Sequence, residues 1–186
     1  FESFLKISAK EPGNITKHQN YFKDTKILED KKFCKKYMGQ FPVISITLKD
    51  VLGDDFESAY LKLAEVVSSK ANEFSFLKES PYLNEMEKAK FNLLCDEIYL
   101  KKADKQAISY VTSAIKSLSL MLYKHFNKQV YILIDEYDVP LAKAQEHGYH
   151  KDMVTLMSSL TVLHVYPCRQ FFRHRALKSA LHVKWY

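Results

Sequence analysis

Hydrophobic residues follow two different periods along this chain, and these periods predict its secondary structure. Two short runs are almost continuously apolar: "VISITL" at 43–48, which follows a proline, and "VYILI" at 130–134. Runs of this kind are typical of strands in a parallel sheet whose two faces are both covered. Between the two runs, apolar residues recur every three or four positions over 56–71, 84–98 and 108–126, which predicts three amphipathic helices.

Local signals support these boundaries. Asp54 or Asp55 can cap the first helix, and Asn84 with Glu87 has the spacing of a capping box for the second. Short helices are expected within the first 40 residues, the last of them closed by Gly39. The order of strand, helices and strand predicts an α/β fold with a parallel sheet flanked by helices and joined by right-handed crossovers.

Composition narrows the class of protein. The chain has 186 residues, of which 47% are hydrophobic and 27% charged, which is typical of one soluble globular domain. No apolar run approaches the roughly 20 residues of a membrane span, and the first residues do not form a secretory signal. We therefore predict a cytoplasmic protein with reduced cysteines. Because Phe1 is not methionine, we also expect the chain to begin inside a longer protein.

The net charge of +6 is unevenly distributed. Residues 1–152 hold 23 lysines and 22 acidic residues, whereas residues 153–186 hold two lysines, three arginines and no acidic residue. The only tryptophan, Trp185, lies in the same part of the chain. The basic character therefore belongs to the end of the chain. We divide the chain into a domain at 1–160 and a basic tail at 161–186.

An acidic pair, Asp135 and Glu136, ends the second apolar run. Ligands of open parallel sheets bind beyond the carboxyl ends of the strands, where both carboxylates would lie. Phosphoryl transfer needs one carboxylate to hold magnesium and another to activate water, and "VYILIDE" has the pattern of a Walker B strand. A solvated strand end with no catalytic role explains the same residues equally well.

Longer stretches resemble one family. "FCKKYMGQFPVISITLKDV", "FESAY", "IDEYDVPL" and "GYH" are similar to the AAA-ATPase-like family of bacterial proteins, over about residues 1–160. Members have a P-loop nucleotidase fold that binds ATP and Mg²⁺, often followed by a nuclease-like domain of the PD-(D/E)XK type. The resemblance implies that Asp135 is the magnesium-side carboxylate and Glu136 the water-activating one. Asp138 is expected to cap the next helix, with Pro140 in its first turn.

One family motif is missing from the chain. A phosphate-binding loop needs Gly-x-x-x-x-Gly-Lys followed by Ser or Thr. The four glycines are far apart and none precedes a lysine. We therefore expect an incomplete nucleotidase-like sheet that lacks the phosphate-loop strand. We also expect that the chain lacks the strand that follows the "GYH" helix in members of this family.

The tail at 161–186 allows three interpretations. Its composition is that of a frameshifted or unrelated sequence. Alternatively, residues 168–183 form a natural basic helix, or the tail contacts nucleic-acid phosphates through its basic and aromatic residues. His147 and His150 could be metal ligands, but no third ligand accompanies them and a surface helix start is the simpler interpretation.

These observations lead to three hypotheses. The first is a fragment of an ATPase whose intact parent uses ATP and Mg²⁺, while this chain is inactive alone and has no cofactor of its own. The second is a non-catalytic module that binds a protein or nucleic acid through the basic tail. The third is a metal-dependent nuclease that uses Asp135 and Glu136 directly, although the lysine such sites need does not follow Glu136. None of the three involves a membrane.

Overall fold

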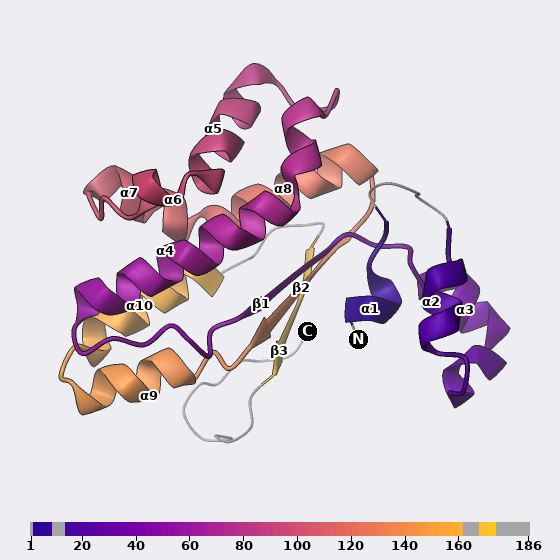
Figure 1. Cartoon of the computed structure of the whole chain (residues 1–186), viewed down its shortest axis with the longest axis horizontal. Coiled ribbons are helices and arrows are strands. Elements are labelled where there is room, and N and C mark those ends of the chain that lie inside the picture. Colours follow the sequence, from indigo (N-terminus) through magenta and orange to yellow (C-terminus); the bar gives the residue numbers. More distant parts are fainter. Residues whose placement is uncertain (1, 9–13, 162–167, 174–186) are drawn as a thin grey trace.

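A computed structural model describes residues 2–8, 14–161 and 168–173 of the chain. It contains a three-stranded parallel sheet with the order β1-β2-β3, formed by Val43–Thr47, Val130–Asp135 and Cys168–Arg173 (Figure 1). Helices surround this sheet on both faces. Their bounds are α1 Glu2–Leu5, α2 Thr16–Tyr21, η1 Lys26–Glu29, α3 Lys31–Tyr37, α4 Phe56–Glu73, η2 Ser75–Glu79, α5 Glu85–Cys95, α6 Glu97–Leu100, α7 Lys105–Thr112, α8 Ala114–Phe126, α9 Val139–Glu146 and α10 His150–Thr161.

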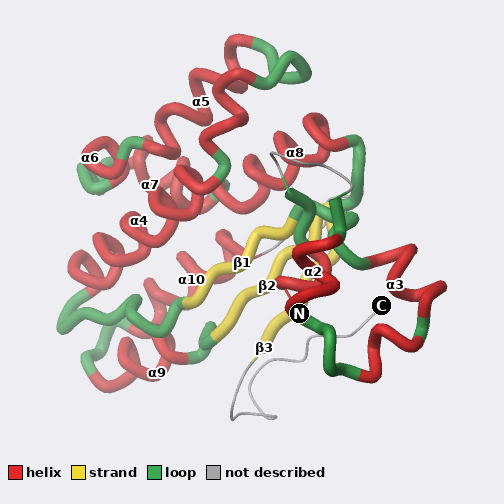
Figure 2. Tube along the Cα trace, turned by 45° about the vertical axis from the view of Figure 1, so that its right-hand side comes forward, coloured by secondary structure: helices red, strands yellow, loops and turns green. Residues whose placement is uncertain are grey.

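Successive side chains of each strand point to opposite faces of the sheet, so the hydrophobic core is divided into two clusters. Ile44 and Ile46 of β1, with Ile132 and Ile134 of β2, belong to a large cluster on one face of the sheet. That cluster is built with α4, α5, α7, α8 and α10. Val43 and Tyr131 point to the other face, where α1 and α3 complete a smaller cluster. Figure 2 shows the sheet between these two groups of helices. The predicted α/β class with a parallel, helix-flanked sheet is therefore confirmed.

Several local predictions are also confirmed. Asp55 accepts a hydrogen bond from the Ser58 amide at the start of α4, and Asn84 with Glu87 forms a complete capping box before α5. Asn127, for which no cap was predicted, ends α8 in the left-handed conformation. Gly39 follows α3 with a φ of +62°. No described helix combines the length and apolar character needed to span a membrane.

The structure corrects three predictions. The helix expected over 108–126 is divided between α7 and α8, with Ser113 joining them in a non-helical conformation. Ile98, expected on the apolar face of the second helix, is 81% exposed because α5 ends at Cys95. Residues 168–173 form β3, so the helical interpretation is wrong for them, and a strand does follow α10. The division of the chain near residue 160 stays a prediction.

Candidate functional site

The carboxyl end of β2 lies in the middle of the sheet. In the strand register, Asp135 is opposite Thr47 of β1 and Arg173 of β3. The Leu48 amide donates a hydrogen bond to the Asp135 carbonyl at 3.0 Å, which continues the pairing to the last residue of the strand. Strands on both sides therefore fix the backbone of Asp135, so the position of its carboxylate depends on few torsions.

The strand ends in a sharp turn at Glu136. Its φ is +56°, the left-handed conformation that non-glycine residues adopt at a cost in energy. The turn is closed by a hydrogen bond from the Val139 amide to the Glu136 carbonyl at 3.2 Å. Because the left-handed residue ends the strand alternation, Glu136 is not forced onto the sheet face opposite Asp135. Strained backbone of this kind is common at functional sites.

Both carboxylates of the pair are half-buried. One oxygen of Asp135, Oδ1, accepts a hydrogen bond from the Glu136 amide at 3.1 Å, which orients the carboxylate at the strand end. The described residues contain no group of three or more His, Cys, Asp or Glu side chains placed to hold a metal ion. Mg²⁺ with a nucleotide needs no such group, because it is bound by one or two carboxylates together with water and phosphate oxygens. The chemistry of the pair therefore fits magnesium that arrives with a nucleotide.

Asp138 does not behave as predicted. It occupies the N-cap position of α9, and Pro140 lies in the first turn, but the Asp138 side chain makes no capping hydrogen bond. Its backbone φ and ψ of −80° and −22° are already helical, whereas a capping residue usually has an extended conformation. Its Oδ1 is buried and has no hydrogen-bond partner among the described residues. The predicted cap is therefore wrong, and a buried acceptor remains next to the acidic pair.

A tyrosine missed by the sequence analysis fixes the loop after β1. The Tyr149 hydroxyl donates a hydrogen bond of 2.7 Å to the carbonyl of Gly53, which lies 96 residues earlier in the chain. Burial raises the pKa of Tyr149. A Cβ at Gly53 would lie 2.5 Å from the Ala59 amide nitrogen, so this loop packs closely against the start of α4. The motif "GYH" indicated the position, but a single sequence does not reveal such a distant contact.

The two histidines lie at the same turn. His147 follows α9 and His150 begins α10, and both are exposed. Among the residues that the structure covers, the only histidine–carboxylate contact of ion-pair length joins His147 Nε2 to Asp54 Oδ1, at 3.8 Å. A surface position at a helix start, rather than a metal centre, agrees with this geometry.

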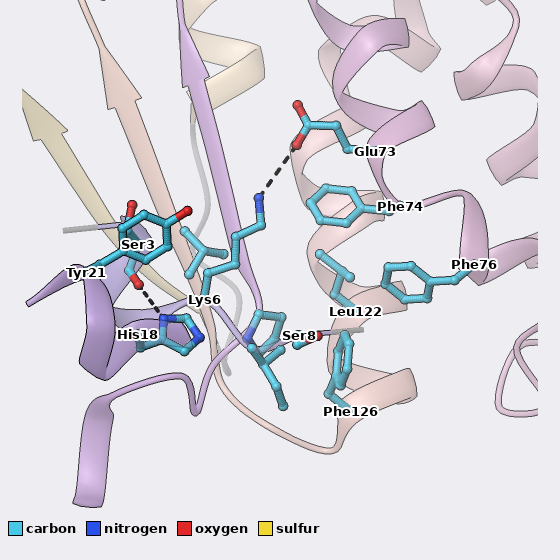
Figure 3. A pocket seen from close by; sticks show the side chains of 13 residues that line it. Ser3, Lys6, Ser8, His18, Tyr21, Glu73, Phe74, Phe76, Leu122 and Phe126 are labelled. Carbon is cyan, nitrogen blue, oxygen red and sulfur yellow. Dashed lines mark hydrogen bonds and ion pairs between the residues drawn. The ribbon is translucent and has the colours of Figure 1, made fainter. Parts of the chain in front are cut away.

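A cavity among the described residues lies away from the acidic pair. A pocket of about 330 Å³ opens at the amino end of β1, at the opposite end of the strand from Thr47 and Asp135 (Figure 3). On one side of the pocket lie Phe74, Phe76, Leu122 and Phe126, with Glu73 beside Phe74, and across from them lie Ser3, Lys6 and His18 (Figure 3). Lys6 Nζ forms ion pairs with Glu2 at 2.9 Å and Glu73 at 3.8 Å. His18 Nδ1 lies 2.6 Å from the Ser3 carbonyl oxygen. The acidic pair does not line this pocket.

Comparison with known protein families decides the relationship. Residues 11–175 match the model of the AAA-ATPase-like family, described as predicted AAA-ATPases. The chain belongs to this family. No curated protein and no solved structure matches it.

Membership of the AAA-ATPase-like family suggests that the chain uses a nucleotide. The family match includes all three strands, β1, β2 and β3, together with the acidic pair. None of the three strands is followed by a loop with the Gly-x-x-x-x-Gly-Lys pattern. The AAA-ATPase-like sheet described by this structure is thus incomplete as a nucleotidase, as predicted.

Proposed function

We propose that the carboxyl end of β2 is the magnesium and water-activating half of an ATPase site. Asp135 would hold Mg²⁺ through its carboxylate, and Glu136 would orient and deprotonate the attacking water. The observation that carries this proposal is the left-handed turn at Glu136, directly after a central strand that ends in Asp135. Ala103 and Asn127 adopt the same conformation, so the support comes from its place directly after Asp135, where a site that needs two adjacent carboxylates would use it.

The phosphate-binding half must come from sequence outside this chain. No glycine here precedes a lysine, so the nucleotide phosphates lack their usual backbone cradle. We therefore propose that the chain is part of a longer ATPase. Alone it would bind ATP weakly and not hydrolyse it. The nuclease-like domain that often follows in related proteins stays a prediction.

Nucleotide titration tests the proposal directly. The chain alone is expected to show no tight Mg²⁺-dependent ATP binding by calorimetry. A longer protein that includes the preceding coding sequence is expected to bind ATP and to release phosphate. In that protein, Glu136→Gln should keep ATP binding and lower the hydrolysis rate by about 10²–10⁴-fold, the usual contribution of a general base.

Two further variants complete this experiment. Asp135→Asn should remove the Mg²⁺ dependence of binding. Glu146→Gln is the matched control, because Glu146 is an exposed glutamate of α9 whose known contact is Lys143 at 3.2 Å. Normal hydrolysis by the Glu136→Gln variant would contradict the role of Glu136. Tight ATP binding by the chain alone, abolished by Asp135→Ala, would contradict the need for an added loop.

A non-catalytic module is the second candidate. It is favoured by the same missing loop, and it predicts that the longer protein neither binds nor hydrolyses ATP. The nuclease hypothesis gains no support, because the lysine that such sites need does not follow Glu136.

A further inference from the structure

The positive charge of the described domain is concentrated in its small N-terminal lobe. Residues 16–37, which form α2, η1 and α3, contain seven lysines and three acidic residues, a net charge of +4. Residues 56–126 contain ten lysines and nine acidic residues, a net charge of +1. We call residues 16–37 the basic lobe. Figure 1 shows it beside the sheet, away from α9.

Lysines of the basic lobe differ from those of the larger helical layer in their contacts. Six of them are exposed and form no ion pair among the described residues: Lys23, Lys26, Lys31, Lys32, Lys35 and Lys36. In the helical layer, by contrast, five of the ten lysines of residues 56–126 contact a glutamate: Lys62, Lys70, Lys88, Lys101 and Lys124. The positive charge of the basic lobe is therefore not neutralised within the described structure.

Helix α3 collects four of these lysines on one side. Lys31 and Lys35, and likewise Lys32 and Lys36, are four residues apart, so each pair lies on the same strip of the helix. The opposite side is inward, because Cys34 is buried and the Phe33 ring stacks on Phe4 at 5.6 Å. Like charges at this spacing destabilise a helix, and a bound polyanion would relieve that repulsion.

Aromatic side chains accompany the lysines. Tyr21 at the end of α2 is 67% exposed, and Phe33 of α3 is 39% exposed. Phe4 joins the two helices, because its ring contacts both Phe33 and Phe22, the residue after Tyr21. Tyr21 is separated from Lys23 by one residue, and Phe33 borders the lysine side of α3, so the lobe combines exposed rings with lysines. Surfaces that bind single-stranded nucleic acids use both, because bases stack on the rings and lysines neutralise the phosphates.

We propose that the basic lobe binds single-stranded nucleic acid. An anionic membrane suits the lobe less well, because membrane-surface helices insert an apolar face and the apolar side of α3 is already packed against Phe4 of α1. The site is separate from the acidic pair and does not rest on the proposed ATPase function. Every variant below retains residues 161–186.

Fluorescence anisotropy with a labelled single strand of mixed sequence, as DNA and as RNA, tests the proposal on the full chain. Binding that weakens with salt is expected. The variant with Lys31, Lys32, Lys35 and Lys36 all changed to Gln should bind at least tenfold more weakly. Its logarithmic salt slope should fall by about 3, since each single-strand phosphate contact contributes about 0.7. Comparing the affinities for the DNA and RNA strands shows which of the two nucleic acids the lobe prefers.

A matched control distinguishes the effect of where the lysines lie from the effect of the total charge of the protein. Lys78, Lys105, Lys116 and Lys151 are also exposed and without an ion pair among the described residues, and changing all four to Gln removes the same charge. This control should weaken binding by no more than about threefold. Tyr21→Ala should weaken it at least fivefold while Tyr21→Phe retains it, since the ring rather than the hydroxyl stacks.

Four results would overturn the proposal: no binding by the unmodified chain, equal losses in the lobe and control variants, duplex binding as tight as single-strand binding, or binding only to vesicles containing phosphatidylserine. Thermal unfolding monitored by circular dichroism checks that each variant folds. Should the fourfold lobe variant unfold, the doubles Lys31→Gln/Lys35→Gln and Lys32→Gln/Lys36→Gln are measured, each expected to lose about half of the slope change.

Discussion

The two ends of the β1–β2 strand pair differ in charge and in the way they are built. At the carboxyl end, the segments 48–55 and 135–160, which begin where the two strands end, hold three lysines and eight acidic residues, and they present Asp135 and Glu136 on a fixed backbone. At the amino end lie the basic lobe and the pocket of Figure 3. A strand pair of only five or six residues thus separates an acidic edge from a basic one.

The difference indicates two separate binding tasks. Magnesium with a nucleotide needs carboxylates at fixed positions, which a strand end supplies. A polyanion needs several exposed cations and tolerates their mobility, which short surface helices supply. If this comparison is correct, the carboxyl end should be the more rigid of the two and should tolerate substitution less well.

Alanine substitution of one glycine at each end gives the largest expected difference. Gly53→Ala should lower the free energy of unfolding by about 3 kcal/mol, because its Cβ would lie 2.5 Å from the Ala59 nitrogen and 2.9 Å from the Asp55 carbonyl oxygen, both backbone atoms. Gly39→Ala at the amino end should cost only about 1 kcal/mol. Its φ of +62° is strained for alanine, but its nearest contact is the His18 side chain, which can move. Urea denaturation measures both; equal costs would contradict the expected rigidity difference.

A smaller effect is expected from a single hydroxyl at each end. Tyr149→Phe removes the hydrogen bond to the Gly53 carbonyl and should lower the free energy of unfolding by about 1 kcal/mol. Tyr21→Phe is the amino-end control and should change it by less than about 0.5 kcal/mol, because Tyr21 is exposed. Urea denaturation of both variants at neutral pH makes the comparison. An unaffected Tyr149→Phe protein would mean that this contact does not fix the loop after β1.

The smallest effects are expected from pH, and they should have opposite directions at the two ends. Near the pocket, burial lowers the pKa of His125 below its ordinary 6.5, so its neutral ring adds stability above that pH and loses it as the pH falls. At the carboxyl end, burial raises the pKa of Tyr149 above 10, so its neutral hydroxyl adds stability below that pH and loses it as the pH rises.

Urea midpoints measured in acid and in alkali check these directions. His125→Phe should reduce the loss of stability between pH 7 and pH 5, and Tyr149→Phe should reduce the loss between pH 9 and pH 11. Each variant serves as the control for the other, because neither should alter the opposite limb. A profile that is unchanged in both variants would mean that other groups cause the pH dependence.

Much of the fold could be predicted from the sequence because its signals are local. The apolar runs gave β1 and β2, and the spacing of Asn84 and Glu87 predicted a capping box that the structure contains. The break at Ser113 was missed because the apolar period of α7 and α8 continues across it. β3 was missed because "CRQFFR" has the polar composition of a surface helix, while its strand conformation comes from pairing with β2.

The candidate site was predictable only in part, for a similar reason. A strand that ends in two acids is visible in one sequence, and so the position of Asp135 and Glu136 in the fold was expected. The left-handed turn at Glu136 had no signal, because neither glycine nor asparagine occupies that position. The partner of Tyr149 was also invisible, since it is a backbone carbonyl in a distant loop. Long-range backbone contacts of this type require the folded structure.

The connection between β1 and β2 has a consequence for folding kinetics. Val43 pairs with Tyr131, 88 residues later, and α4 to α8 lie in between. Closing so long a loop is entropically unfavourable until the intervening chain has become compact, and distant parallel pairings slow folding. During synthesis, β1 must also wait until β2 has been translated, with its apolar edge unpaired. We therefore expect the helices from α4 to α8 to fold first and the sheet to form late, with the chain most prone to aggregation in that interval.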